Sequence, residues 1–266
     1  MANAVPKLKK LIKDGKVAVG TWAQMASAEA VEMVGSAYFD FVVIDTEHGH
    51  FGLDTALHMV RAAEASGTAP LIRISEKNPT LILKALDMGA QGVVVPGVST
   101  KEDAEMAVKA ARYAPLGDRG ACPYIRAAGH TARDWGKYAT DANENSVVCL
   151  LVEGAEGAAN FEDIVAVPGV DVVMIGPFDL SVSLGVGGQV THPLVIEKLE
   201  QMAGIAKKNG VALAGVIFEL APAQIKQDIE RWMKLGSSVL MVGGDKMFLA
   251  SAFRNAAEVA ATFKRQ

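Results

Sequence analysis

The sequence predicts a single (β/α)8 TIM barrel, in which parallel strands alternate with helices around one core. The chain has 266 residues, close to the length of one such barrel. Strand-like and helix-like segments alternate from end to end, as in an α/β fold. The strand-like segments are continuous apolar runs, as expected for parallel strands buried on both faces. We therefore expect residues 1–266 to form one barrel domain.

The candidate strands are short runs rich in Val, Ile and Leu. Most of them end near a glycine, a proline or a polar side chain, which is where a buried strand reaches a loop. No Gly-x-Gly-x-x-Gly motif follows the first run and no P-loop is present, so a dinucleotide fold is not expected. In chain order the candidate strands are Val17–Thr21, Phe39–Ile44, Pro70–Ile74, Gly92–Val95, Val147–Val152, Val172–Ile175, Val211–Ile217 and Ser238–Val242.

The segments between these runs have helical patterns with recognisable ends. Asp54–Ser66 begins at an acidic residue and ends before Gly67, and Pro79–Met88 begins at a proline after Asn78. The connection from Tyr113 to Ser146 is expected to be a long loop, a feature that is often functional. The remaining helix candidates are Lys101–Arg112, Glu156–Val167, Pro193–Asn209, Ala221–Leu235 and Lys246–Lys264.

Composition excludes several classes of function. Hydrophobic residues make up 50% of the chain and charged residues 21%, which favours an ordered core. The net charge is −4 without a basic block, so nucleic acid is not an expected partner. No apolar run is long enough to cross a membrane, and Met1 to Lys16 lacks a signal-peptide core. Cys122 and Cys149 form no metal or disulfide pattern, so a cytoplasmic location is expected.

The C-terminal ends of the strands carry the chemistry of a barrel. The richest end is Asp45-Thr46-Glu47-His48-Gly49-His50. A carboxylate three residues before an imidazole can orient it, so Asp45 and His48 are candidates for an oriented general base. The alternative is a polar loop that caps the next helix. His50 is expected at the surface or in contact with residues that themselves touch the substrate. Trp22 lies at the end of the first candidate strand.

The third candidate strand contains Arg73 between two isoleucines. A guanidinium in such a place must reach solvent or pair with an anion, and at a barrel mouth it suits a substrate carboxylate. The alternative is a structural ion pair with a nearby acid such as Glu47. The fourth strand ends without a titratable group and is expected to contribute only shape.

Glu153 and Asp179 each stand where an apolar run ends, about one strand–helix unit apart. Neighbouring parallel strands would place both carboxylates at one end of the barrel, where two hard oxygen ligands predict a divalent-metal site. The alternative is that each carboxylate caps the helix that follows it. No lysine lies within a candidate strand, which disfavours a Schiff-base mechanism and favours a metal as the electron sink.

The last two strand ends give weaker indications. Glu219 is a candidate carboxylate at the mouth of the barrel. The run Gly243-Gly244-Asp245 stands where barrels often hold phosphate, but it predicts a tight turn with a helix cap more strongly than a phosphate site.

Motifs spread along the chain, in order, resemble one enzyme family from about Gly20 to about Phe253. They are Asp45-Thr46-Glu47-His48-Gly49, Arg73, Leu86-Asp87-Met88-Gly89-Ala90-Gln91-Gly92-Val93-Val94-Val95-Pro96, Tyr113-Ala114-Pro115-Leu116-Gly117-Asp118-Arg119-Gly120, Glu153, Gly176-Pro177-Phe178-Asp179-Leu180-Ser181 and His192-Pro193. Any one of these motifs alone is weak, but jointly they are specific. Together they resemble the HpcH/HpaI-type class II pyruvate aldolases, which include the 4-hydroxy-2-oxoheptanedioate and 2-dehydro-3-deoxyglucarate aldolases.

The resemblance implies a barrel of the phosphoenolpyruvate/pyruvate-domain type and a carbon–carbon lyase. The enzyme would cleave or form 4-hydroxy-2-oxo acids from pyruvate and an aldehyde, by way of a metal-stabilised pyruvate enolate. Members of the family serve in aromatic compound catabolism. The family is also often hexameric, as a trimer of dimers with exchanged C-terminal helices, so a homo-oligomer of this kind is implied here.

The resemblance also implies a role for each matching site residue. Glu153 and Asp179 would hold a divalent metal, Mg2+, Mn2+ or Co2+. His48, oriented by Asp45, would be the base, and Arg73 would stabilise the enolate. The substrate-binding residues would be Arg73, Gly176, Pro177, Phe178, Trp22 and Glu47.

Two departures from the family pattern keep other functions open. Leu151 stands where many members have glutamine, and the loop Ala121-Cys122-Pro123-Tyr124-Ile125-Arg126 replaces a run of small residues. Tyr124 and Arg126 would then shape a different aldehyde pocket or face a neighbouring subunit. One alternative is a related barrel enzyme that uses another enolate, in a citrate synthase-like or citrate lyase-like reaction. Another is a non-catalytic barrel that binds a small acid.

Overall fold

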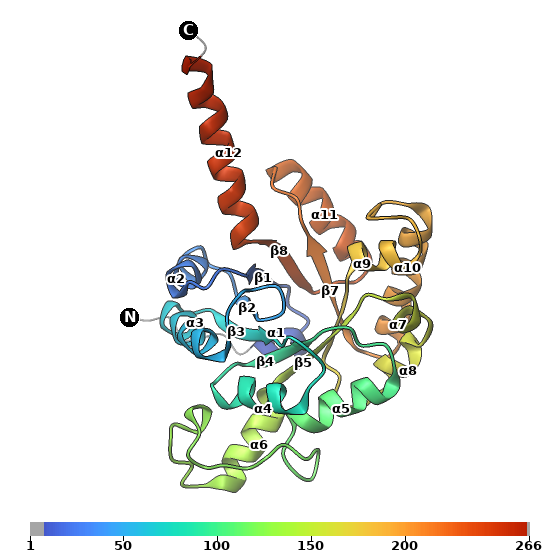
Figure 1. Ribbon diagram of the computed structural model, residues 1–266. Helices are drawn as coiled ribbons and strands as arrows, with labels where there is room; N and C mark the ends of the chain where they lie inside the picture. Colours follow the sequence, from blue (N-terminus) through green and yellow to red (C-terminus); the bar gives the residue numbers. More distant parts are fainter. Residues whose placement is uncertain (1–7, 265–266) are drawn as a thin grey trace.

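The computed structural model describes residues 8–264 and contains a closed barrel of eight parallel strands in chain order (Figure 1). Pairing between β8 and β1 closes the barrel, with an irregularity in register between Gly20 and Trp22. The predicted (β/α)8 barrel is therefore confirmed. The strands are β1 (Ala18–Ala23), β2 (Phe41–Asp45), β3 (Ala69–Arg73), β4 (Gly92–Val95), β5 (Val147–Val152), β6 (Val172–Ile175), β7 (Ala212–Ile217) and β8 (Val239–Gly244).

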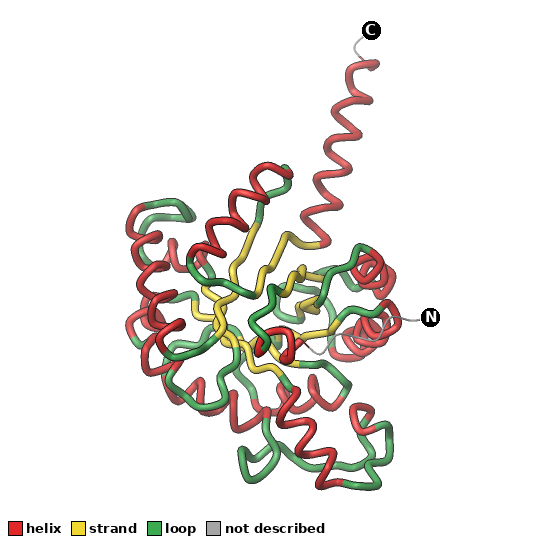
Figure 2. The backbone as a smooth tube through the Cα atoms, turned by 180° about the vertical axis from the view of Figure 1, so that it is seen from behind, coloured by secondary structure: helices red, strands yellow, loops and turns green. Residues whose placement is uncertain are grey.

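Helices follow the strands on the outside of the barrel, and the last helix projects away from it (Figures 1 and 2). Their ends follow the local sequence: Asn78 accepts a hydrogen bond from the Thr80 amide at 2.8 Å, and Gly67 ends its helix with a φ of 82°. The helices are α1 (Leu8–Lys13), α2 (Ala28–Ser36), α3 (Leu53–Ser66), α4 (Pro79–Asp87), α5 (Lys101–Ala111), α6 (Trp135–Asn145), α7 (Ala155–Ala159), α8 (Phe161–Val165), α9 (Pro177–Ser183), α10 (Pro193–Lys208), α11 (Pro222–Lys234) and α12 (Asp245–Lys264), with a 3-10 helix at Arg126–Ala128.

The structure corrects the sequence prediction in two connections. The segment from Tyr113 to Ser146 is not loop throughout, because it contains α6, whose N-cap Asp134 accepts from the Lys137 amide at 3.0 Å. This helix buries Ala139 and Asn143, and its Trp135 and Tyr138 rings pack against Tyr113. The predicted helix Glu156–Val167 is in fact two short helices, α7 and α8, which meet at Asn160.

The core has two layers because successive strand residues face opposite sides of the sheet. Along β5, Val147, Cys149 and Leu151 belong to the cluster that fills the barrel. The alternate residues Val148, Leu150 and Val152 belong to the cluster packed between the strands and the helices. The next inward position after Leu151 is Glu153, which places that carboxylate at the mouth of the barrel.

The N-terminal end of the barrel is closed by α1 and a group of buried charges. The Lys9 ammonium lies 3.0 Å from the Asp171 carboxylate, which also accepts from Arg112 at 2.9 Å. Burial lowers the pKa of Lys9, although the charge of Asp171 opposes that shift. The open end of the barrel is consequently the opposite one. Across residues 8–264, none of the helices has both the length and the apolar character that a membrane span needs.

Candidate active site

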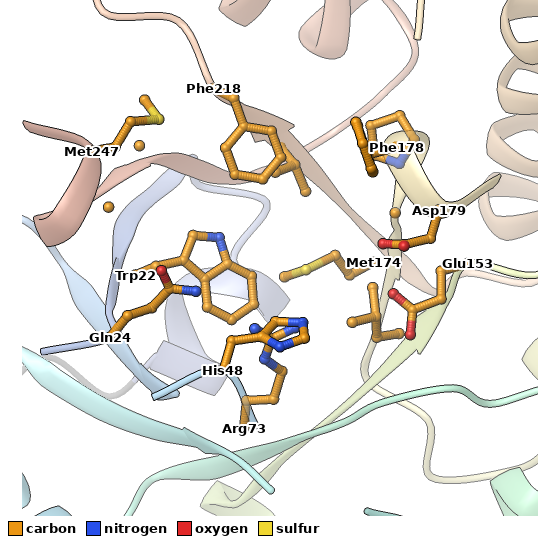
Figure 3. Close-up of a pocket in the computed structure, with 16 residues that line it drawn as sticks. Trp22, Gln24, His48, Arg73, Glu153, Met174, Phe178, Asp179, Phe218 and Met247 are labelled. Atoms are coloured by element: carbon orange, nitrogen blue, oxygen red, sulfur yellow. The ribbon is translucent and has the colours of Figure 1, made fainter. Parts of the chain in front are cut away.

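A cavity of about 410 Å³ opens at the C-terminal end of the barrel (Figure 3). The structure brings together eight of the predicted catalytic, substrate-binding and metal-binding residues, and they line this cavity. They are Trp22, His48, Arg73, Glu153, Gly176, Pro177, Phe178 and Asp179. Asp45 and Glu47 do not line the cavity, but both form ion pairs with Arg73, which does. The predicted location of the chemistry at the strand ends therefore agrees with the position of the cavity.

Arg73 is held between two carboxylates at the end of β3. Its Nε donates to Oδ1 of Asp45 at 2.8 Å, and a second guanidinium nitrogen pairs with Oδ2 of the same residue. Another nitrogen lies 3.1 Å from Oε2 of Glu47. The guanidinium also stacks on Trp22, with 4.5 Å between its central carbon and the ring centroid. Arg73 thus forms the ion pair with Glu47 that the sequence left open, and it still faces the cavity.

Asp45 is completely buried, and its carboxylate accepts hydrogen bonds from several donors. Besides Arg73, it accepts from the Gln24 side chain at 2.8 Å and from the backbone amides of Glu47 and His48 at 3.1 and 3.2 Å. Burial would raise the pKa of Asp45, but hydrogen bonds and charge from Arg73 hold it below its usual range. The sequence predicted that this carboxylate orients the imidazole of His48. The contacts in the structure instead hold the backbone of that residue.

Glu153 and Asp179 lie beside each other on one wall of the cavity (Figure 3). Burial, followed by the negative charge of Asp179, raises the pKa of Glu153 to about 7. The Gly97 amide donates to Oε1 of Glu153 at 3.1 Å. The end of β4, expected to contribute only shape, thus supplies a hydrogen bond. Gly97 adopts a positive φ of 59°, a conformation that favours glycine.

The remaining lining is mostly apolar. It includes Leu151, which the sequence marked as a departure from the family pattern, and it adds Met174, Val216, Phe218 and Met247. Most of these side chains occupy inward positions of their strands. Inward side chains recur at every second residue along a strand. Counting two residues beyond Val216 gives Phe218, and counting two beyond Trp22 gives Gln24.

Some predicted residues lie elsewhere. Phe218 rather than Glu219 lines the cavity from the end of β7. Arg126 pairs with Glu64 and donates to the Met88 carbonyl at 2.8 Å, so in this chain it packs against α3 and α4 instead of an aldehyde pocket. The predicted cap Asp245 accepts from the amides of Gln24 and Met25 at 3.0 and 2.9 Å, which fastens the end of β1 to the start of α12.

Comparison with known proteins identifies the family. The sequence profile of the HpcH/HpaI aldolase/citrate lyase family matches residues 18–243. The chain belongs to this family. It is 31% identical over 262 residues to the 5-keto-4-deoxy-D-glucarate aldolase of Escherichia coli K12, covering 97% of both chains.

Solved structures agree with the family. The HpcH/HpaI aldolase of Desulfitobacterium hafniense DCB-2 superposes with a TM-score of 0.87 at 29% identity, covering 97% of both chains. The citrate synthase SbnG superposes with a TM-score of 0.84 at 29% identity, also over 97% of both chains. The resemblance drawn from the sequence motifs is confirmed, and this chain is a carbon–carbon lyase of the aldolase class. The family generally depends on a divalent metal and acts on small molecules.

Proposed function

We propose that this protein is a metal-dependent aldolase that cleaves or forms 4-hydroxy-2-oxo acids from pyruvate and an aldehyde. The observation that carries the proposal is the pair of adjacent carboxylates, Glu153 and Asp179, in one cavity with His48 and Arg73. Retro-aldol cleavage needs a base for a hydroxyl proton and a positive environment for the developing enolate. Those two kinds of group line the cavity together with the candidate metal ligands.

Glu153 and Asp179 are the proposed ligands of a divalent cation, Mg2+, Mn2+ or Co2+. Both offer hard oxygen atoms, which such cations prefer. Burial and then the negative charge of Asp179 raise the pKa of Glu153, and a bound cation would favour the charged carboxylate against both effects. Across residues 8–264 there is no group of three or more His, Cys, Asp or Glu side chains placed to hold a metal, so water and substrate oxygens would complete the coordination. The cation would supply a Lewis acid for the oxygens of pyruvate.

The pyruvate half of the substrate is proposed to lie between Arg73 and the first turn of α9. Pro177 has no amide hydrogen, so the donors available there are the amides of Phe178 and Asp179, which have no partner within the helix. These amides would bind the pyruvate carboxylate. Arg73 would bind the keto oxygen, with Trp22 and Glu47 holding the guanidinium in place.

His48 is proposed to move the proton. It takes the proton of the 4-hydroxyl group, directly or through a water molecule, and the oxygen forms the aldehyde carbonyl as the C3–C4 bond breaks. The electron pair of that bond remains on C3 and is delocalised onto the keto oxygen that Arg73 faces. His48 then returns its proton to C3, and pyruvate and the aldehyde leave. Asp45 supports this step by fixing the backbone amide of His48 and the orientation of Arg73.

Exchange of the C3 hydrogens of pyruvate for deuterium tests this function without knowledge of the aldehyde. After removal of bound metal with EDTA and addition of Mg2+, Mn2+ or Co2+, we expect exchange in the wild-type protein. The double variant Glu153→Gln with Asp179→Asn should lose both metal binding and exchange. Retention of both in that variant would refute the assignment of the ligands, and a lack of exchange in the wild type would refute the reaction.

A second candidate is favoured by the similarity to the citrate synthase SbnG and by Leu151 beside Glu153. In that case the enolate would come from another donor, in a citrate synthase-like or citrate lyase-like reaction. Incubation with oxaloacetate, with and without acetyl-CoA, distinguishes the two. Formation of citrate would favour this candidate, whereas an aldol product from pyruvate favours the first.

We also propose a homo-oligomer, a hexamer in which α12 is exchanged between subunits. In the single chain α12 projects from the barrel, and Phe253, Val259 and Phe263 are 66%, 65% and 74% exposed (Figure 1). Such apolar surface on a projecting helix suits contact with another copy. We also propose a cytoplasmic location. The free thiols of Cys122 and Cys149 agree with it. Light scattering should give the mass of six chains.

A further inference from the structure

Gln24 joins the end of β1 to the carboxylate of Asp45. Ala23 pairs with Ile44 in the register of β1 and β2, so the residues that follow them, Gln24 and Asp45, also lie opposite each other. The side-chain nitrogen Nε2 of Gln24 donates to Oδ2 of Asp45 at 2.8 Å. Because an ionised carboxylate accepts hydrogen bonds but cannot donate them, this contact fixes which end of the Gln24 amide faces Asp45.

Asp45 is held from both neighbouring strands. Its Oδ2 accepts from Gln24, which follows β1, and from a guanidinium nitrogen of Arg73, which ends β3. Its Oδ1 accepts from Nε of Arg73 and from backbone amides of the loop after β2. Rotation of the carboxylate would break bonds at both oxygens. The Gln24 amide therefore opposes such rotation and keeps the carboxylate facing the guanidinium.

The same contact favours the charged form of Asp45. Burial raises the pKa of this carboxyl group, whereas hydrogen bonds and charge from Arg73, followed by the hydrogen bond from Gln24, hold it below its usual range. An ionised Asp45 is the form that pairs with the guanidinium.

The backbone of Gln24 is fixed independently of its side chain. Its amide donates to Oδ1 of Asp245 at 3.0 Å, and the Met25 amide donates to Oδ2 of Asp245 at 2.9 Å. Substitution of the Gln24 side chain leaves both of these bonds in place. The side chain lies across the cavity from Glu153 and Asp179 (Figure 3), so its loss should not disturb a cation held by those carboxylates.

We propose that Gln24 is a positioning residue of the aldolase, which acts through Asp45 to orient Arg73 toward the keto oxygen of pyruvate. This inference rests on the proposed function, in which Arg73 stabilises the developing enolate. Donors that point at a developing charge must be held in place before the reaction. A guanidinium that turns away from the keto oxygen gives up that stabilisation.

The variant Gln24→Met removes the donor and keeps the length of the side chain. Deuterium exchange into C3 of pyruvate should fall about tenfold or more, because a hydrogen bond to a charged group is lost. The affinity for Mn2+ should stay within about threefold of the wild type, which shows that the barrel mouth is folded. Exchange at the wild-type rate in Gln24→Met would overturn the proposal.

Gln201→Met is the matched control. Gln201 is exposed on α10, where its side chain donates to Glu197 at 3.2 Å and accepts from Lys198 at 3.1 Å, outside the cavity. This variant should exchange deuterium at the wild-type rate. Loss of exchange in both variants would overturn a specific role for Gln24.

The variant Gln24→Glu gives a pH-dependent signature that a merely structural role would not produce. It places a second carboxyl group against Asp45, and two carboxylates in contact do not both ionise readily. At low pH the pair shares a proton, which restores a donor to Asp45. The exchange rate of Gln24→Glu relative to wild type should therefore rise about fivefold or more from pH 8 to pH 5. The relative rate of Gln24→Met should not change with pH, and a flat relative rate in Gln24→Glu would refute the proposal.

The charged and titratable groups around this position come from three elements, and the wild type contains all of them. Their own titration consequently affects both proteins, and the relative rate isolates the new carboxyl group. They are Asp45, Glu47 and His48 at the end of β2, Arg73 on β3, and Asp245 and Lys246 at the start of α12, where the Lys246 ammonium donates to the His48 carbonyl at 3.3 Å.

A double variant tests whether Gln24 acts through Asp45. If it does, Asp45→Asn combined with Gln24→Met should exchange deuterium no more than about twofold more slowly than Asp45→Asn alone. A loss equal to the product of the two single losses would mean that Gln24 acts independently, and would overturn the proposal. The pH comparison decides the question by itself if Asp45→Asn exchanges too slowly to measure.

Exchange in the wild type separates this inference from the proposed function. If the wild type exchanges the C3 hydrogens and Gln24→Met exchanges them equally fast, the inference fails and the aldolase function stands. If exchange is absent from the wild type, the proposed function fails and the inference fails with it.

Discussion

Asp45 and Arg73 are direct partners in the register of β2 and β3, and their side chains form two hydrogen bonds at the mouth of the barrel. Asp45 is completely buried and the Arg73 side chain is 8% exposed. Breaking one partner of a buried ion pair leaves an uncompensated charge, which is more costly than never having formed the pair. This contact therefore links the stability of the barrel to the orientation of a proposed substrate-binding group.

The variant Asp45→Asn should be less stable than the wild type at neutral pH by about 1.5–3 kcal/mol, the range for hydrogen bonds to charged groups. Because Arg73 lowers the pKa of Asp45 in the folded state, this contribution is present above the unfolded pKa of about 3.9 and is lost as pH falls through the folded value. Urea unfolding of both proteins between pH 7 and pH 3 measures the difference, which should shrink below pH 4. A difference that does not depend on pH would refute the ion-pair explanation.

The carboxylate of Glu153 should destabilise the metal-free protein at alkaline pH. Its folded pKa of about 7 lies above the unfolded value of about 4.3, so stability is full below the unfolded pKa and is lost as pH rises through 7. At pH 8, Glu153→Gln should stabilise the metal-free protein on the order of 2 kcal/mol. At pH 4 the two proteins should be nearly equal.

Addition of a divalent metal at pH 8 should stabilise the wild type but not Glu153→Gln, so that the wild type becomes the more stable protein. A ligand that binds only the folded state raises stability as its concentration exceeds the dissociation constant. Thermal melts at pH 8 with and without Mn2+ should therefore show an increase in Tm for the wild type and none for Glu153→Gln. An equal increase in the two proteins would contradict the assignment of Glu153 as a metal ligand.

Gly176 is required for space beside Glu153. A Cβ at this position would lie 2.9 Å from the Cβ of Glu153 and 3.2 Å from its Oε2, closer than ordinary contacts. We expect Gly176→Ala to displace the Glu153 carboxylate and weaken Mn2+ binding about tenfold or more, since overpacking costs about 1–3 kcal/mol. Isothermal titration calorimetry measures the affinity. Gly204→Ala on α10 is the control, because nothing lies within 4 Å of its Cβ, and it should leave metal affinity unchanged.

Much of the site could be predicted because a parallel barrel places the ends of its strands around one mouth. The inward positions lead to Asp45 and Arg73 at the ends of β2 and β3, and to Glu153 just past the end of β5. The sequence could not decide which groups pair across strands. It associated Asp45 with His48 because they are close in sequence, whereas the register places Asp45 opposite Arg73.

The missed helix α6 has a different cause. Its stability depends on the cap at Asp134 and on Asn143, whose side chain accepts from the Tyr113 amide at 2.7 Å and donates to the Tyr113 carbonyl at 3.0 Å. Trp135, Tyr138, Ala139 and Ala142 repeat at helical spacing, but the position that completes the buried face is the polar Asn143. The contact that stabilises this helix joins residues far apart in the chain and becomes visible only in the folded structure.

His48 can be separated from its neighbour His50 by their positions. Both side chains are exposed, but His48 lines the cavity and His50 does not. If His48 moves the proton of the 4-hydroxyl group, His48→Gln should lower kcat for cleavage of a 4-hydroxy-2-oxo acid by about 10²–10⁴-fold, the usual contribution of a general base. The affinity for Mn2+ should stay within about threefold of the wild type, because His48 is not a proposed ligand.

The variant His50→Gln makes the matching change two residues away and should retain the wild-type kcat within about twofold. Stopped-flow measurement of single turnovers keeps product release from hiding the chemical step. A comparable loss in both variants would mean that the loop after β2 acts through its structure rather than through the imidazole of His48. Loss in His48→Gln alone, with metal affinity preserved, places the proton transfer on His48 and leaves to Glu153 and Asp179 the binding of the cation.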